Sequence, residues 1–391
     1  MSRLFTLAVC LSLACGAPET KAPLKQATRR SEVIPSEFIV KLKENNGLVS
    51  SHVDTVKSLG GTVMHQYLNL PEFVGYAVKA SDDVVEHLRS LPGVEYIEEN
   101  MQVNASADCK VQEEATWGIV RTNVRPLNLD GVYAYSSSTP DSVIGYVIDT
   151  GIYIDHPEFE GRAEWGTDTV DEPSTRTDEN GHGTHVAGTM VSKTWGISKI
   201  STVVAVKVLG ASGSGTNAGV IAGIDWAAAD RTKRKKKGVA NMSLGGSRST
   251  ATNDAVDAAV KSGLVLVVAA GNSNFDACYY SPASATKAIS VGATDSTDQR
   301  SYFSNYGKCV DIFGPGSGIT STWNQGPYSD NTISGTSMAS PHVAGVAMKM
   351  WNKNLHYTAE QLIQAVLSQS TNDTVKDVQG SPNKMVFDDC A

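Results

Sequence analysis

The sequence lacks an excess of positive charge and, beyond its first residues, any long apolar run. Its net charge of −8 at pH 7 argues against nucleic acid as the natural partner. A membrane-spanning helix needs roughly 20 apolar residues, and no segment offers them, so we expect no membrane span. A hydrophobic content of 41% is that of a globular protein, and a length of 391 residues indicates two or three domains.

Residues 1–16 have the pattern of a secretory signal peptide. Arg3 supplies a basic start, residues 4–14 form a short apolar region, and the small residues Gly16 and Ala17 offer a cleavage point. We therefore expect a secreted, extracellular protein. A bacterial lipoprotein signal ending at Cys15 is an alternative that Ser12 disfavours, because a large aliphatic residue is usual at that place.

Cysteine is scarce outside this segment. Four residues remain there, namely Cys109, Cys278, Cys309 and Cys390. An even count in a secreted chain favours disulfides, and four cysteines allow three pairings. Free thiols are the alternative.

From about residue 117 onward, apolar strands alternate with helical segments. We expect strands at residues 143–148, 201–208, 239–243, 264–270 and 288–291, and helices from residue 181 and at residues 219–229, 252–262 and 337–351. This alternation predicts an α/β fold with a mostly parallel sheet covered by helices.

Two residues have the context of a proton-transfer pair. Asp149 follows the first of these strands, so its carboxylate lies at the carboxyl end, where open α/β sheets bind ligands. His182 lies between two glycines, titrates near neutrality and can take and return a proton. A turn aspartate and a structural histidine are the alternatives. Zinc is disfavoured because His182 and His185 lack the Glu of a His-Glu-x-x-His site.

Ser337 and Asn272 have the context of a nucleophile and an oxyanion donor. Ser337 is predicted at a helix start, where free N–H groups and a partial positive charge favour a developing oxyanion. Asn272 follows a buried strand, and its amide could donate to that oxyanion. For Ser337, an ordinary helix cap is the alternative.

The residues Asp149, His182 and Ser337 occur in the chain order of subtilisin. From about residue 117 to its end, the chain resembles subtilisin-like serine proteases (subtilases), and among them the proteinase K-like branch. The matching runs are residues 146–151, 156–163, 181–185, 241–246, 303–307 and 335–345. The resemblance implies a three-layer subtilisin-like core in which Ser337 is the nucleophile, His182 the general base, Asp149 the orienting carboxylate and Asn272 the oxyanion donor.

The resemblance also implies a substrate cleft. Its walls around the side chain before the scissile bond would be Ser243, Leu244, Gly245, Ala269, Ala270 and Gly271. The segment Gly213, Ser214 and Gly215 would pair with the substrate as an added strand. Asn217 stands where many members of that branch carry an aromatic residue.

Calcium and the disulfide pairing follow from the resemblance as well. Asp311 matches a calcium-binding carboxylate of that branch, and backbone carbonyls near Thr286 and Ala288 would complete the oxygen shell. The pairing Cys278–Cys309 is implied because some relatives bridge these positions, and with it Cys109–Cys390. We expect no cofactor for catalysis itself.

The residues before the core alternate short strands and helices, and this α+β unit resembles a subtilase propeptide, an inhibitor and folding chaperone. We expect a propeptide at residues 17–105 and a catalytic domain at residues 106–391, with self-cleavage between about Asn104 and Ala107. An accessory domain with another role is the alternative.

The sequence also predicts an exposed basic segment and one glycosylation site. The basic run at residues 231–237 is expected to be an exposed loop, with an anionic-surface contact or a self-nicking site as alternatives. Three glycosylation sequons begin at Asn104, Asn241 and Asn372, and only Asn372 is a credible mature site because Asn241 should be buried beside the cleft.

We expect a secreted serine endopeptidase, made as a self-cleaving zymogen, that hydrolyses peptide bonds through an acyl-enzyme on Ser337. Specificity should be broad, with apolar or aromatic side chains before the scissile bond, and the protein should be a monomer inhibited by its own propeptide. The non-enzyme alternatives are an inert homologue that binds peptides and a propeptide-like protease inhibitor. A serine-carboxyl protease would have a Glu in place of His182, and a proprotein convertase would need a further β domain after Ser337.

Overall fold

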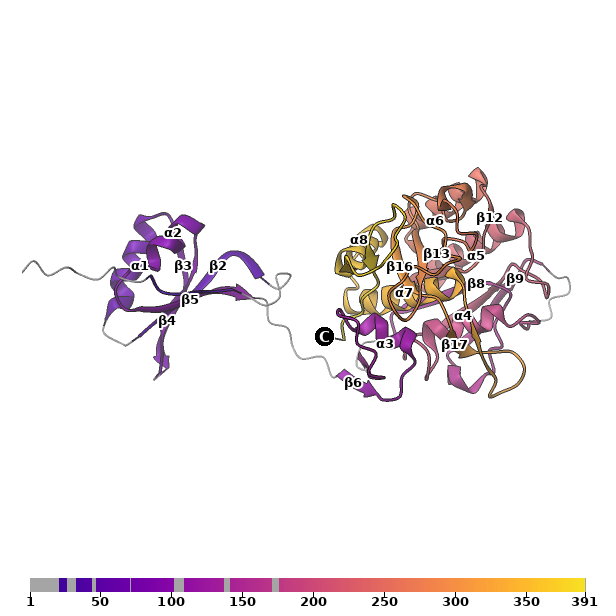
Figure 1. Cartoon of the computed structure of the whole chain (residues 1–391), viewed down its shortest axis with the longest axis horizontal. Helices are drawn as coiled ribbons and strands as arrows, with labels where there is room; N and C mark the ends of the chain where they lie inside the picture. The colour runs from indigo at the N-terminus through magenta and orange to yellow at the C-terminus, as the bar shows by residue number, and fades with distance from the viewer. Residues whose placement is uncertain are drawn as a thin grey trace, which may run out of the picture. The chain divides into compact units, whose positions relative to one another are not determined.

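The computed structural model describes residues 21–26, 33–43, 47–70, 72–101, 109–136, 141–170 and 176–390 (Figure 1). The chain divides into two compact units, Met1–Ala105 and Ser106–Ala391. The expected signal peptide and the expected cleavage junction lie outside the described residues, as does the sequon at Asn104.

The first unit is an α+β body with its own apolar core. Its sheet has the order β1-β5-β2-β4-β3, and β2 runs antiparallel to both β4 and β5. Strand β3 was not expected, because it is mostly exposed and rich in polar residues, and its pairing with β4 defines it. The bounds are β1 (Leu24–Lys25), β2 (Val33–Leu42), α1 (Leu48–Ser58), β3 (Thr62–Leu70), β4 (Phe73–Lys79), α2 (Asp82–Leu88) and β5 (Val94–Met101).

The second unit alternates strands and helices, as the sequence predicts. Its first half contains β6 (Cys109–Gln112), α3 (Trp117–Asn123), β7 (Tyr133–Ser136), β8 (Val143–Asp149), η2 (Pro157–Phe159), β9 (Ala163–Asp168), α4 (His182–Val191), β10 (Val203–Lys207), α5 (Asn217–Arg234) and β11 (Lys237–Met242). Its second half contains β12 (Gly246–Ser247), α6 (Thr250–Ser262), β13 (Leu264–Ala269), η3 (Ala277–Tyr279), β14 (Tyr280–Ser281), β15 (Ile289–Thr294), β16 (Ile312–Pro315), β17 (Ile319–Thr322), β18 (Asp330–Ile333), α7 (Thr336–Lys353), α8 (Ala359–Gln369), β19 (Thr371–Asn372) and β20 (Lys384–Met385).

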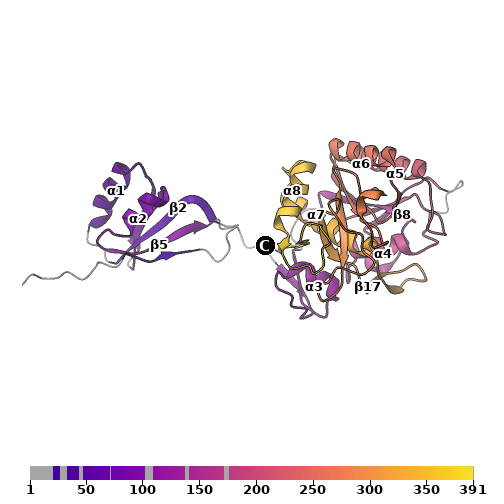
Figure 2. The ribbon, with the colours of Figure 1, turned by 45° about the horizontal axis from the view of Figure 1, so that its top comes forward.

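A mostly parallel sheet forms the middle layer of this unit. Among the described residues it has nine strands in the order β19-β20-β16-β15-β13-β11-β8-β10-β9, and only β19 with β20 is antiparallel. Strands β8 and β13 are buried along their whole length, because helices cover both faces of the sheet. Helices α5 and α6 lie on one face, and α4 and α7 lie on the other (Figure 2). The predicted α/β fold with a three-layer core is confirmed.

The basic run at residues 231–237 is only partly the exposed loop that the sequence predicts. Residues 231–234 end α5, Lys235 and Lys236 connect it to β11, and residues 232–235 are exposed. Arg231 and Arg234 lie in the last turns of α5, where positive side chains are stabilised by the negative end of the helix dipole. The guanidinium of Arg231 donates to the carbonyl of Ser262, and Arg234 forms ion pairs with Asp230 and Glu164. Most of this charge is therefore used within the fold.

Two disulfides are formed, Cys109–Cys390 and Cys278–Cys309. The first joins residues 281 positions apart, near the start and the end of the second unit, and the second closes a segment of 31 positions. Within the described residues, no helix is both long and apolar enough to span a bilayer.

Removing the longer crosslink should destabilise the second unit more than removing the shorter one. A crosslink restricts the unfolded chain more as the closed loop grows, which predicts a loss of about 5 kcal/mol for Cys109→Ser/Cys390→Ser and about 3–4 kcal/mol for Cys278→Ser/Cys309→Ser. Denaturant unfolding of full-length chains under non-reducing conditions measures both losses. Equal midpoints for parent and variants would contradict the expectation.

Candidate active site

Asp149 is the last residue of β8 and is fully buried. Its Oδ1 atom accepts hydrogen bonds from Nδ1 of His182 at 2.7 Å and from the backbone N–H of Thr150 at 2.8 Å. Its Oδ2 atom is buried and has no hydrogen-bond partner in the described part of the chain. A desolvated carboxylate of this kind strongly favours a positive charge on the imidazole beside it.

His182 is the first residue of α4, and two glycines allow it to reach Asp149. Gly181 caps the helix with φ of 100°, and a Cβ there would lie 2.6 Å from the ring of Trp323. A Cβ on Gly183 would lie 2.1 Å from the carbonyl oxygen of Gly151, so only glycine allows the helix to approach the end of β8 this closely.

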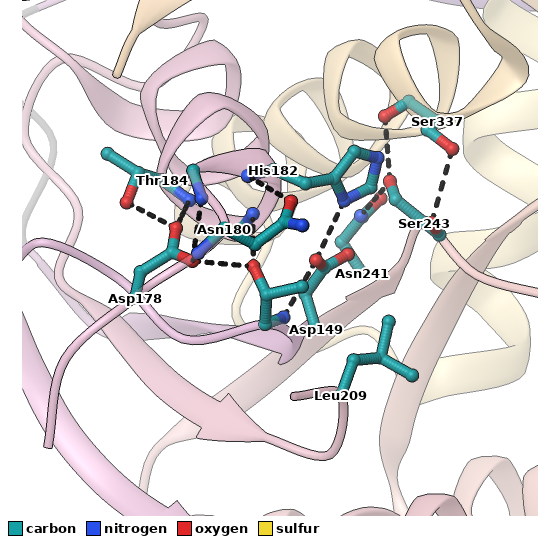
Figure 3. A network of polar contacts seen from close by, with 12 residues as sticks. Asp149, Asp178, Asn180, His182, Thr184, Leu209, Asn241, Ser243 and Ser337 are labelled. Atoms are coloured by element: carbon teal, nitrogen blue, oxygen red, sulfur yellow. Dashed lines mark hydrogen bonds and ion pairs between the residues drawn. The ribbon is translucent and has the colours of Figure 1, made fainter. Parts of the chain in front are cut away.

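The environment of His182 favours its protonated form. Burial of the ring lowers its pKa, but the charge and hydrogen bond of Asp149 outweigh burial, and Asp178 adds to their effect. The pKa of His182 is therefore raised above its ordinary value. In Figure 3 the ring lies between Asp149 and Ser337.

Ser337 lies in the first turn of α7, one residue after the helix begins at Thr336. Its hydroxyl donates to the carbonyl of Ser243 at 3.1 Å. Its own carbonyl accepts a bond from the hydroxyl of Ser243 at 2.7 Å. Pro341 follows in the second turn of the helix. Since proline has no N–H, the Ser337 carbonyl remains available to Ser243.

The Asn272 side chain is oriented by the residue before Ser337. Its Oδ1 atom accepts bonds from the backbone N–H and the hydroxyl of Thr336, both at 2.8 Å. The amide NH₂ group is on the other side of the carboxamide, and Asn272 is exposed at the cleft. A Cβ on Gly335 would lie 3.5 Å from the Asn272 nitrogen, so the donor faces the start of α7.

His182, Ser337 and Asn272 line one cleft of about 590 Å³, and the buried Asp149 is connected to it through its hydrogen bond with His182. Every residue predicted to contact the substrate also lines it, namely Gly213, Ser214, Gly215, Ser243, Leu244, Gly245, Ala269, Ala270 and Gly271. Sequence reasoning did not identify Asn180, Leu209, Val220 and Tyr280 as lining residues.

His185 lies outside the cleft. Its Nε2 atom contacts the carbonyls of Ile319 and Asn331 at 3.0 and 3.1 Å, and its ring packs edge-on against Trp323. Burial lowers its pKa to about 4. The described residues contain no group of three or more His, Cys, Asp or Glu side chains placed to hold a metal. These contacts favour the structural interpretation of His185.

Asp311, Thr286 and Ala288 lie outside the cleft. Burial raises the pKa of Asp311, and its Oδ2 atom accepts the backbone N–H of Ser290 at 2.8 Å. Asp257 fixes the neighbouring segment, because its carboxylate accepts bonds from the Thr286 hydroxyl and the Lys287 N–H.

The two remaining sequons differ in exposure. Asn372 is exposed in β19, whereas Asn241 is fully buried and donates to Ser243. Glycosylation at Asn372 stays a prediction.

Comparisons with known proteins agree with this site. Residues 141–385 match the family described as "Subtilase family", and residues 37–106 match "Peptidase inhibitor I9". The chain is 42% identical to an extracellular serine proteinase of Thermus sp. (strain Rt41A), over 98% of this chain and 97% of that protein. It is 44% identical to the subtilisin-like serine protease Pen ch 18 of Penicillium rubens, over 83% of this chain and 69% of that protein.

A solved structure of a cold adapted subtilisin-like serine proteinase is 45% identical and superimposes with a TM-score of 0.66, covering 70% of this chain and 98% of that chain. These relatives are compatible with the proteinase K-like branch. The matched regions, the fold and the cleft together establish that this chain belongs to the subtilase family and is a subtilisin-type serine endopeptidase.

Proposed function

We propose that the protein is a secreted endopeptidase that cleaves peptide bonds through an acyl-enzyme on Ser337. The observation that carries this proposal is the Asp149–His182 hydrogen bond in the cleft that also holds Ser337 and Asn272. Ser337 Oγ attacks the peptide carbonyl after a change of rotamer turns it from Ser243 toward His182, and His182 accepts its proton. His182 then gives this proton to the leaving amine as the C–N bond breaks, and a water molecule activated by His182 hydrolyses the ester and restores Ser337. Asp149 stabilises the imidazolium, and the Asn272 amide donates to the oxyanion.

The cleft supports a preference for apolar or aromatic side chains before the scissile bond. Its wall residues at 243–245 and 269–271 are small or apolar, and the bordering backbone is rich in glycine. Among the residues that the structure describes, no Asp, Glu, Lys or Arg side chain lines this cleft. The segment 213–215 would bind the substrate backbone as an added strand.

The first unit supports synthesis as a zymogen. It matches the peptidase inhibitor I9 family, and the division of the chain after Ala105 agrees with a propeptide at residues 17–105 and a catalytic domain at residues 106–391. Extracellular relatives support secretion after removal of residues 1–16. The propeptide would act as an intramolecular inhibitor until self-cleavage between about Asn104 and Ala107.

The Ser337→Ala precursor tests this function directly. The parent chain should lose roughly its first hundred residues and digest casein, because self-cleavage needs the nucleophile. The variant should stay long and inert, as measured by gel mass, N-terminal sequencing and casein hydrolysis. If both chains were shortened alike and neither cut casein, processing by another enzyme and an inert core would replace this proposal.

Asn272→Ala should slow catalysis with little effect on binding. The lost donor stabilises only the developing oxyanion, so kcat should fall by about 10²–10³ with KM nearly unchanged, as for the matching asparagine of subtilisin. Steady-state kinetics on a short chromogenic peptide measure this. Asn128→Ala is the control, because that exposed side chain lies outside the cleft and, among the described residues, bonds only to Asp130. A loss confined to KM would contradict the oxyanion role.

Structural calcium is supported by the surroundings of Asp311. The carboxylate is largely buried, and its Oδ1 atom accepts no hydrogen bond from the described residues. Carbonyls of the segment held by Asp257 would add oxygen ligands of the kind Ca²⁺ requires. The ion would hold this loop and would take no part in catalysis.

Chelation should therefore lower the melting temperature. At a free concentration of about 100 Kd, calcium would contribute about 2.7 kcal/mol, which corresponds to about 4–5 °C for a unit of this size. Scanning calorimetry with and without chelator, in Ser337→Ala chains to prevent self-digestion, measures the shift. The Asp311→Asn variant should have the same melting temperature with and without chelator. If chelator left the melting temperature of the Ser337→Ala parent unchanged, the proposed calcium site would be rejected.

A further inference from the structure

Asp178 is a buried carboxylate four residues before His182, and it carries an unusual number of hydrogen bonds. Its side chain is 2% exposed. Oδ1 accepts from the Thr150 hydroxyl at 2.8 Å and from the backbone N–H groups of Asn180 and Gly181 at 3.1 and 2.9 Å. Oδ2 accepts from the N–H and the hydroxyl of Thr184 at 2.9 and 2.6 Å. Figure 3 shows the carboxylate facing Thr184 and Asn180.

These bonds replace the cap that α4 lacks. Gly181 has no side chain, so the first three N–H groups of the helix need other acceptors. The side-chain Oδ1 atom of Asn180 accepts from the N–H of His182, the Thr150 hydroxyl from that of Gly183, and the Asp178 carboxylate from that of Thr184. Since Asp178 also holds Thr150 and the Asn180 backbone, all three caps depend on it directly or through one neighbour.

The charge of Asp178 matters as well as its geometry. His182 becomes an imidazolium at the positive end of the α4 dipole, which disfavours that charge. Asp149 on β8 and Asp178 on the preceding loop are the carboxylates that act on the ring, and His185 faces it from the same helix. Nearby, Glu179 is paired with the buried Lys207 of β10. Asp178 is therefore a negative charge at the helix start that forms no ion pair with any Lys or Arg of the described residues.

We propose that Asp178 is a positioning residue for catalysis: its carboxylate fixes the start of α4 so that the His182 ring faces Asp149 and Ser337, and it offsets the helix dipole when the ring is protonated. The proposal rests on the general-base role of His182 proposed above. It assigns Asp178 no contact with substrate.

Asp178→Asn keeps the size of the side chain but removes its charge and turns an N–H donor toward its former partners. Because a misplaced base slows the chemical step, kcat per titrated active site should fall about 10–100-fold, with KM changed less than about threefold. The acid limb of the kcat/KM profile should move to lower pH by at least about half a unit, since loss of a nearby negative charge disfavours the imidazolium.

Glu164→Gln is the matched control. It removes the same charge from a carboxylate of β9 that pairs with Arg234 at the surface and takes no part in the three bonds that cap α4. We expect its kcat within about twofold of the parent and an unmoved acid limb, because its carboxylate is not among the groups acting on His182. An equal shift in both variants would overturn the proposal, and so would an Asp178→Asn enzyme with lowered stability but parental kcat and pH profile.

A spectroscopic measurement covers the case in which Asp178→Asn cannot mature. In Ser337→Ala chains, the His182 Nδ1 proton bonded to Asp149 should give a far-downfield resonance whose titration reports the pKa without any activity. The Asp178→Asn substitution should lower that midpoint or broaden the resonance by exchange, and an unchanged resonance in a folded chain would overturn the proposal. If the parent enzyme were inactive, the proposed protease function would be wrong. If the parent were active but Asp178→Asn changed neither kcat nor the resonance, only the role of Asp178 would be wrong.

Discussion

The hydrogen bond between His182 Nδ1 and Asp149 Oδ1 determines how the rest of the catalytic unit must be arranged. It joins the start of a helix on one face of the sheet to the end of a central strand, and these elements must approach within van der Waals contact. The approach requires glycine at Gly183 and a hydrogen-bonded loop before it that is anchored by the buried Asp178. The parallel strands β10, β8, β11 and β13 then bring the cleft-forming loops to the same edge of the sheet.

Helix α7 supplies the second fixed point. It is buried along almost its whole length, since the sheet, α4 and α8 surround it, so Ser337 at its start is held by packing. The reciprocal bonds between Ser337 and Ser243 link that start to the end of β11, and Asn272 links it to the end of β13. The nucleophile is therefore fixed from three elements that are far apart in the sequence.

Much of this could be predicted from the sequence because the relevant signals are local. Apolar runs before Asp149 and Asn272 identify strand ends, and small residues around His182 and Ser337 identify close approaches. Contacts that depend on the tertiary arrangement could not be predicted. The bond from Ser243 to the Ser337 carbonyl needs both the sheet register and Pro341, and the capping by Asp178 needs a glycine helix cap beside Thr150. The basic run was predicted correctly as exposed, but its first four residues belong to α5, because a helix C-terminus favours positive charge as much as a solvated loop does.

The dense bonding around α4 has an electrostatic reason. A buried carboxylate is costly unless hydrogen bonds or an opposite charge satisfy it. Asp149 leaves one oxygen unsatisfied and meets its cation only when His182 is protonated, whereas Asp178 is satisfied by five donors at all times. The two carboxylates therefore serve different ends. Asp178 gives a rigid frame that needs no proton, and this frame lets Asp149 remain poised to stabilise a charge that forms only during the reaction.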